Sequence, residues 1–138
     1  MSVLSEERAE IVARAWFARL GAGDPAPDMC DPAIEIRNWA ESPVPGPYQG
    51  HEGLQQWWRA VNDPDMGVEI QMFRLEEIIE LDEERVVTIQ RATGRGRASG
   101  FEIDQRWGAI LTVRNGKVVS AVGYPSPDAT LRAAGLIE

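Results

Sequence analysis

The feature that most constrains the fold is a succession of four strand-like runs in the second half of the chain. The runs span residues 68–75, 85–92, 100–113 and 117–124. RNGK at 114–117 places Asn-Gly at the centre of a two-residue turn, the strongest short-range signal for a β-hairpin. TGRGRASG at 93–100 indicates a looser hairpin connection. Together the runs predict one antiparallel meander.

The first half of the chain is predicted to be mainly helical. Residues 5–21 and 52–61 carry apolar side chains at three- and four-residue spacing, which is typical of amphipathic helices. A short helical turn is expected near residues 28–30, and AIEIRNW at 33–39 alternates like a strand. SPDATLRAAGL at 126–136 closes the chain with a short helix. This order predicts an α+β fold with the helices on one face of the sheet.

Length and composition limit the classes of function. The 138 residues, 43% of them hydrophobic, suffice for a single domain over 1–138 with its own core. A net charge of −8 argues against nucleic acid and anionic membrane surfaces as partners. No run approaches the roughly 20 apolar residues of a membrane span, and the acidic, amphipathic start is unlike a signal peptide. A single cysteine, Cys30, excludes an internal disulfide, so we expect a cytoplasmic protein.

Two stretches carry a resemblance to a known family. They are GPYQGHEGLQQWW at 46–58 and GRASGFEIDQRWGAILTVRNGKVVSAVGYPSPDATLRAAGL at 96–136. With the element order, they resemble the nuclear transport factor 2-like superfamily, and more narrowly its SnoaL-like branch. The resemblance implies a curved antiparallel sheet wrapped by N-terminal helices into a cone around an apolar pocket, often dimeric through the outer sheet face. Members include isomerases, epoxide hydrolases, polyketide cyclases and domains without catalysis, so function must be argued from the pocket.

The enzymes of this superfamily offer a residue-by-residue test. Matched to ketosteroid isomerase, the chain has Trp16 at the oxyanion tyrosine, Asn38 at the base and Ala109 at the oxyanion acid. Asn38 cannot accept a proton at neutral pH, so the resemblance does not carry that mechanism. Matched to limonene epoxide hydrolase, the chain retains Arg85, but Val87 and Gly123 replace the two aspartates.

The histidine and the cysteine each allow two interpretations. His51 is a candidate general base near the pocket mouth, although QGHEG at 49–53 also suits the start of a helix, which is the favoured interpretation. With one histidine in the chain and no ligand spacing among the carboxylates, we expect no metal site and no cofactor. Cys30 is expected to be a structural thiol rather than a nucleophile.

Strand alternation selects the remaining site candidates. It places Gln105 and Trp107 inward with Ala109, and it groups Arg85, Val87, Ile89 and Arg91 together on the neighbouring strand. The expected catalytic residues are Asn38, His51 and Gln105. The expected ligand-binding residues are Trp16, Asn38, Tyr48, Trp57, Arg85, Arg91, Gln105 and Trp107. The alternative is that the tryptophans fill the cone as core.

Residues of the opposite parity on these strands are predicted to form the outer face of the sheet. The residues expected there are Val86, Glu102, Asp104, Arg106, Ile110 and Thr112. Their mixture of charged and apolar side chains fits either a solvated surface or a homodimer interface, and the resemblance favours the dimer. The leading hypothesis is a SnoaL-like pocket protein for a small hydrophobic molecule, acting as a cofactor-free isomerase, cyclase or hydrolase if it is an enzyme. The alternative is a non-catalytic ligand-binding or dimeric interaction domain of the same fold.

Overall fold

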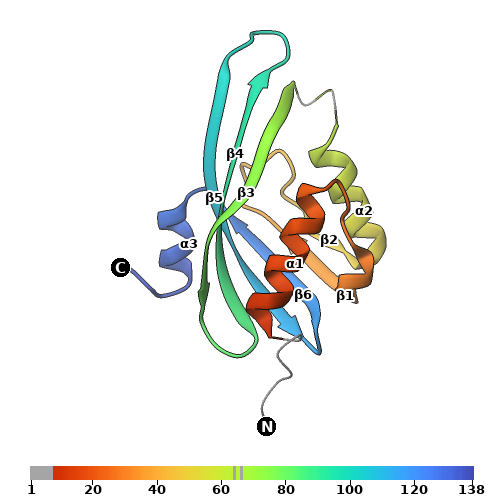
Figure 1. Cartoon of the computed structure of the whole chain (residues 1–138), viewed down its shortest axis with the longest axis vertical. Helices are drawn as coiled ribbons and strands as arrows, with labels where there is room; N and C mark the ends of the chain where they lie inside the picture. Colours follow the sequence, from red (N-terminus) through yellow and green to blue (C-terminus); the bar gives the residue numbers. More distant parts are fainter. Residues whose placement is uncertain (1–7, 64, 66) are drawn as a thin grey trace.

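The computed structural model describes residues 8–63, 65 and 67–138 and has an α+β architecture (Figure 1). The helices are α1 (Ala9–Gly21), the short 3-10 helix η2 (Pro27–Met29), α2 (Gly50–Val61) and α3 (Pro127–Ala133). The strands are β1 (Cys30–Arg37), β2 (Tyr48–Gln49), β3 (Val68–Glu80), β4 (Arg85–Gly96), β5 (Glu102–Arg114) and β6 (Lys117–Tyr124). All six form one sheet in the order β2-β1-β6-β5-β4-β3.

The predicted meander is confirmed. β3, β4, β5 and β6 pair antiparallel in sequence order. Asn115 and Gly116 form the turn between β5 and β6 with φ of 52° and 74°. Asn and Gly tolerate this left-handed geometry, which matches the twist of the flanking strands. One detail differs from the expected antiparallel sheet, since β1 runs parallel to β6 and makes the sheet mixed.

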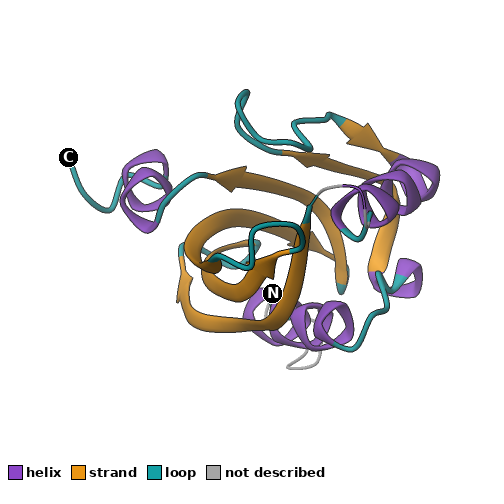
Figure 2. Ribbon diagram, turned by 90° about the horizontal axis from the view of Figure 1, so that it is seen from above, coloured by secondary structure: helices purple, strands orange, loops and turns teal. Residues whose placement is uncertain are grey.

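Element boundaries differ from the predictions mainly in length. β3 and β4 continue to Glu80 and Gly96, and the two residues of β2 lie in a stretch expected to be a loop. α1 is described from Ala9, and the part of the predicted helix at residues 5–7 lies outside the described residues. The sheet formed by the long β3, β4 and β5 is strongly curled, as the view from above shows (Figure 2).

The helices lie on both faces of the sheet. α1 and α2 cover the concave face, while α3 packs on the other side of β5 (Figure 1). A β-carbon on Gly108 of β5 would lie 2.2 Å from Thr130 Oγ1, so only glycine lets α3 approach this closely. Thr130 is fully buried there. The expectation that all helices share one face was therefore wrong for α3.

The register of β4 against β5 corrects the predicted parity of β4. Gln90 pairs with Trp107, and Ala92 pairs with Gln105. Because directly paired residues point to the same face, the inner face of β4 carries its even-numbered residues. Val86, expected outside, is therefore in the core beside Leu111.

The odd-numbered residues of β4 consequently point away from the concave face. They are Arg85, Val87, Ile89 and Arg91, all expected inside. Val87 and Ile89 are nevertheless buried, like their inward neighbours. A strand buried on both faces shows no hydrophobic alternation, which is why the parity could not be read from the sequence. The outward placement of Asp104 and Arg106 on β5 is confirmed by their ion pairs with Arg91 and Glu76.

Candidate functional site

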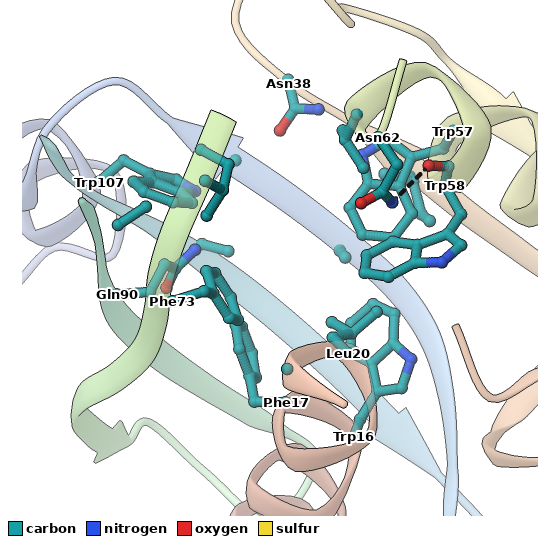
Figure 3. Close-up of a pocket in the computed structure, with 18 of the residues that line it drawn as sticks. Trp16, Phe17, Leu20, Asn38, Trp57, Trp58, Asn62, Phe73, Gln90 and Trp107 are labelled. Carbon is teal, nitrogen blue, oxygen red and sulfur yellow. Dashed lines mark hydrogen bonds between the residues drawn. The ribbon is translucent and has the colours of Figure 1, made fainter. Parts of the chain in front are cut away.

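A cavity of about 420 Å³ lies between the concave face of the sheet and helices α1 and α2 (Figure 3). This volume falls within the range of roughly 300–1,000 Å³ that is usual for small-molecule sites. Aromatic side chains and four amides make up much of the wall, and aliphatic residues and glycines complete it. The amide side chains are Asn38, Asn62, Gln71 and Gln90.

Six aromatic rings form a continuous row along the cavity wall, which we call the aromatic arc. In order of contact they are Trp58, Trp57, Trp16, Phe17, Phe73 and Trp107. Successive ring centroids lie 5.6, 6.3, 6.0, 5.8 and 5.9 Å apart. The rings come from α2, α1, β3 and β5, so the arc joins both helices to the sheet. They line the cavity without filling it.

Two asparagines reach the cavity with their amide groups in a fixed orientation. Asn38 Nδ2 donates to Val44 O at 2.9 Å, and Asn62 Nδ2 donates to Trp58 O at 2.8 Å. A backbone carbonyl can only accept, so each amide must direct its NH₂ group to that carbonyl. Each Oδ1 is thereby left as an acceptor. Figure 3 shows the oxygen of Asn38 turned toward the cavity.

Gln90 brings a third amide to the wall from β4. The residue is 4% exposed, and Thr88 Oγ1 donates to its Oε1 at 3.0 Å. Gln90 Nε2 donates to none of the described residues. Trp16, in contrast, uses its Nε1–H away from the cavity, in a 2.9 Å hydrogen bond to Pro25 O. Trp16 thus presents only ring carbon to a ligand.

The described lining residues include no Asp, Glu, His, Lys, Arg or Cys. The described part of the cavity wall therefore offers no side chain that would exchange a proton near neutral pH. Within the described ranges, no group of three or more His, Cys, Asp or Glu residues is placed to hold a metal ion. None of the described helices is long and apolar enough to cross a membrane.

The structure brings together part of the predicted site. Of the expected residues, Trp16, Asn38, Trp57 and Trp107 line the cavity. The positions matched to catalytic residues by resemblance, Ala109 and Gly123, line it as well. Five expected residues lie outside its lining, namely Tyr48, His51, Arg85, Arg91 and Gln105.

His51 has a structural contact. Its Nε2 lies 2.9 Å from Cys30 O, which ties the first turn of α2 to the start of β1.

Burial raises the pKa of the Cys30 thiol to about 12, so the thiolate does not form at neutral pH. Tyr48 packs against the core from β2, where Gly53 of α2 approaches its backbone closely.

Arg85, Arg91 and Gln105 make their contacts away from the cavity. Arg85 Nε donates to Asp82 Oδ2 at 2.8 Å in the turn between β3 and β4. Arg91 Nε donates to Asp104 Oδ1 at 2.7 Å on the outer face, and this hydrogen bond lowers the pKa of the Asp104 carboxyl. Gln105 shares the inner face with Ala92 but is exposed beyond the cavity.

Sequence reasoning missed five lining residues that matter for the site. They are Phe17, Trp58, Asn62, Phe73 and Gln90. Gln90 would have followed from Trp107 if the register of β4 and β5 had been known, since the two are paired. Phe73 sits between two register shifts in β3, at 70–72 and 75–77, so simple alternation could not place it. Helical spacing alone does not indicate that Trp58 and Asn62 face the cavity.

The α+β cone with helices on its concave face defines a nuclear transport factor 2-like fold. The family model of the SnoaL-like domain matches residues 13–121. The chain belongs to this family. No curated protein matches it in a sequence comparison.

Solved structures support the same fold. A nuclear transport factor 2-like protein from Burkholderia xenovorans is 27% identical, with a TM-score of 0.71, and the match covers 96% of this chain and 98% of that one. A proposed isomerase from Bacillus subtilis is 16% identical, with a TM-score of 0.67 and coverage of 97% and 98%. A proposed SnoaL-like polyketide cyclase from Mesorhizobium loti is 20% identical, with a TM-score of 0.60 and coverage of 82% and 95%.

Proposed function

We propose that the chain binds a small organic molecule with a mostly hydrophobic surface in the cavity of the cone. The observation that carries this proposal is the aromatic arc around a volume of about 420 Å³, with amide side chains as the polar contacts. A largely apolar wall with a few placed polar groups is the usual composition of a ligand site. The proposed isomerase and the proposed polyketide cyclase among the solved structures support a small organic ligand.

Binding is favoured over acid–base catalysis by the chemistry of the wall. General acid–base catalysis needs a group whose pKa lies near the working pH. The described lining residues include no such group. A reaction in this cavity would depend on amide donors such as Gln90 Nε2, which can polarise a carbonyl by hydrogen bonding to it. A cofactor-free isomerase, cyclase or hydrolase of that kind is the second candidate.

A filled-cavity variant tests the proposal. Ala92 is 6% exposed and lines the cavity, so Ala92→Leu places a larger side chain inside it. Ala133→Leu is the matched control, because Ala133 is exposed on α3. Both variants and the parent protein are examined by native mass spectrometry and by thermal shift with small ketones, epoxides and polycyclic aromatics.

We expect a co-purified molecule, or an upward thermal shift, for the parent and Ala133→Leu, and neither for Ala92→Leu. The proposal fails if the parent carries no molecule and no compound shifts its melting temperature. It also fails if Ala92→Leu retains the ligand. Turnover of a panel compound that is lost in Gln90→Leu would establish the catalytic candidate instead.

We also propose that two copies pair through the outer face of β5 and β6. Ile110 pairs with Val122, and Thr112 pairs with Ser120, on this face, and all four are only half-buried in one copy. Three of the four, Ile110, Thr112 and Val122, are β-branched, and such a half-buried row supports a partner sheet. Native mass spectrometry at the mass of two chains, shifting to one chain in Val122→Glu, is the expected result, and a monomeric parent would refute the pairing. A cytoplasmic location stays a prediction.

A further inference from the structure

We propose that the ligand is an organic cation, an ammonium group that carries alkyl or aryl substituents. This inference rests on the proposed function, because it specifies the charge of the molecule that occupies the same cavity. Three groups of lining atoms set the sign of the electrostatic potential there. They are the aromatic arc, two amide oxygens and two helix ends.

The aromatic arc offers π-electron density around one side of the cavity (Figure 3). The face of an aromatic ring carries negative charge, so it attracts a cation within about 6 Å of the ring centroid, and tryptophan does so best. Four of the six rings in the arc are tryptophans. The alkyl groups of a substituted ammonium also suit this apolar wall better than a bare, strongly hydrated ion would.

The two asparagines add hydrogen-bond acceptors with a fixed direction. The NH₂ groups of Asn38 and Asn62 are engaged by Val44 O and Trp58 O, at 2.9 and 2.8 Å. Rotating either amide would face its oxygen against a carbonyl oxygen, which is repulsive. The negative end of each amide dipole therefore stays available to the cavity.

The two long helices end at the same cavity. α1 ends at Gly21, and α2 ends at Val61, and both residues belong to the lining. The C-terminal end of an α-helix carries a partial negative charge. Arg19, in the last turn of α1, does not cancel this effect there, because its guanidinium is held by Asp24 and Asp28. Arg59, in the last turn of α2, is exposed and offsets part of the charge at that helix end, so α1 contributes more of the negative potential.

Gln90 is compatible with a cation because its amide can reverse. Thr88 Oγ1 donates to Gln90 Oε1 at 3.0 Å and lies 3.5 Å from Ala109 O. A hydroxyl both donates and accepts. When Thr88 donates to Ala109 O instead, it accepts from Gln90 Nε2, and the glutamine oxygen then faces the cavity. An anion, in contrast, finds no Lys, Arg or His among the described lining residues.

The test compares two probes of one shape. Benzyltrimethylammonium carries a positive nitrogen where neopentylbenzene carries a neutral carbon. Their dissociation constants are measured by tryptophan fluorescence on the full chain. We expect the cation to bind about tenfold tighter, as befits cation–π contacts in a desolvated site. Equal or tighter binding of neopentylbenzene would overturn the inference while leaving the proposed function intact, and binding of neither probe would count against both.

Two cavity variants show which residues cause the preference for the cation over the neutral probe. Asn62 is exposed at the end of α2, so Asn62→Leu should fold normally and remove one acceptor. We expect it to weaken the cation several-fold, by the loss of one charge–dipole contact, and not to weaken neopentylbenzene. Trp57→Leu should weaken the cation more than neopentylbenzene, whereas Trp39→Leu, outside the lining, should change neither. Equal losses for the two probes in both cavity variants would refute a charge-specific site.

Discussion

Gly123 lies where β6 passes Asn38, and we expect its replacement by alanine to reshape the cavity wall. A β-carbon at this position would lie 2.1 Å from Asn38 Oδ1 and 3.2 Å from Asn38 Cγ. The carboxamide must therefore rotate away. Its hydrogen bond from Nδ2 to Val44 O, 2.9 Å long, would be lost with that rotation. Gly123 itself has no positive φ, so the backbone would otherwise accept alanine.

The loss of unfolding free energy in Gly123→Ala follows from these contacts. A lost hydrogen bond contributes about 1 kcal/mol, and crowding in a packed site about 1–3 kcal/mol. We expect Gly123→Ala to reduce the free energy of unfolding by about 2 kcal/mol, or a melting temperature lower by roughly 6 °C in a domain of this size. In the Asn38→Ala background the clash is absent, since the next atom, Arg37 O, lies 3.8 Å from that β-carbon. The same change should then cost close to nothing.

Urea unfolding of the parent, the two single variants and the double variant measures the coupling between the two positions. We expect a coupling energy of about 1–2 kcal/mol, because the two residues share one contact. If Gly123→Ala costs the same in both backgrounds, Asn38 does not rest against Gly123. The fixed direction of its oxygen, on which the cation inference depends, would then be wrong.

Three other predictions test parts of the fold. Gly108→Ala should cost about 1–3 kcal/mol in urea unfolding by crowding Thr130, and Thr130→Ala should restore part of the loss. The hydrogen bond from Arg106 lowers the pKa of Glu76, so its stabilising contribution is present above the unfolded pKa and is lost as pH falls through the folded one. Arg106→Gln should therefore flatten the fall of melting temperature below about pH 4. Cys30, buried and with its pKa raised to about 12, should react with iodoacetamide only after unfolding, and rapid labelling of the native chain would contradict this.

Local signals were sufficient to predict most of the fold. The Asn115-Gly116 turn has the geometry that its residues favour, and β6 begins and ends as predicted. Such features depend on a few neighbouring residues, which the sequence displays directly. The parallel pairing of β1 with β6 and the docking of α3 depend on contacts between distant segments. Gly108 permits that docking, but nothing near it in the sequence indicates Thr130 as its neighbour.

The candidate site was harder to predict for a similar reason. Trp16 and Trp107 line the cavity as expected, the former by resemblance and the latter by alternation along β5. Alternation failed on β4, where Val87 is buried on one face and Thr88 on the other. Register, rather than composition, decides which of the two faces is inner, and a shift of one residue exchanges them. The wrong parity on β4 therefore left Gln90 out of the predicted site and placed Arg91 inside in error.

The amide of Asn38 has a physical advantage over a carboxylate in this wall. Its NH₂ group satisfies Val44 O, which the oxygen of an ionised carboxyl would repel. Among the described lining residues no cation would offset a buried negative charge, so burial would raise the pKa of a carboxyl group placed there. An amide avoids that cost and still presents a fixed negative dipole. A cavity built in this way attracts a positive ligand without keeping an unpaired charge of its own when empty. The same amide that cannot accept a proton thus supports the proposed preference for a cation.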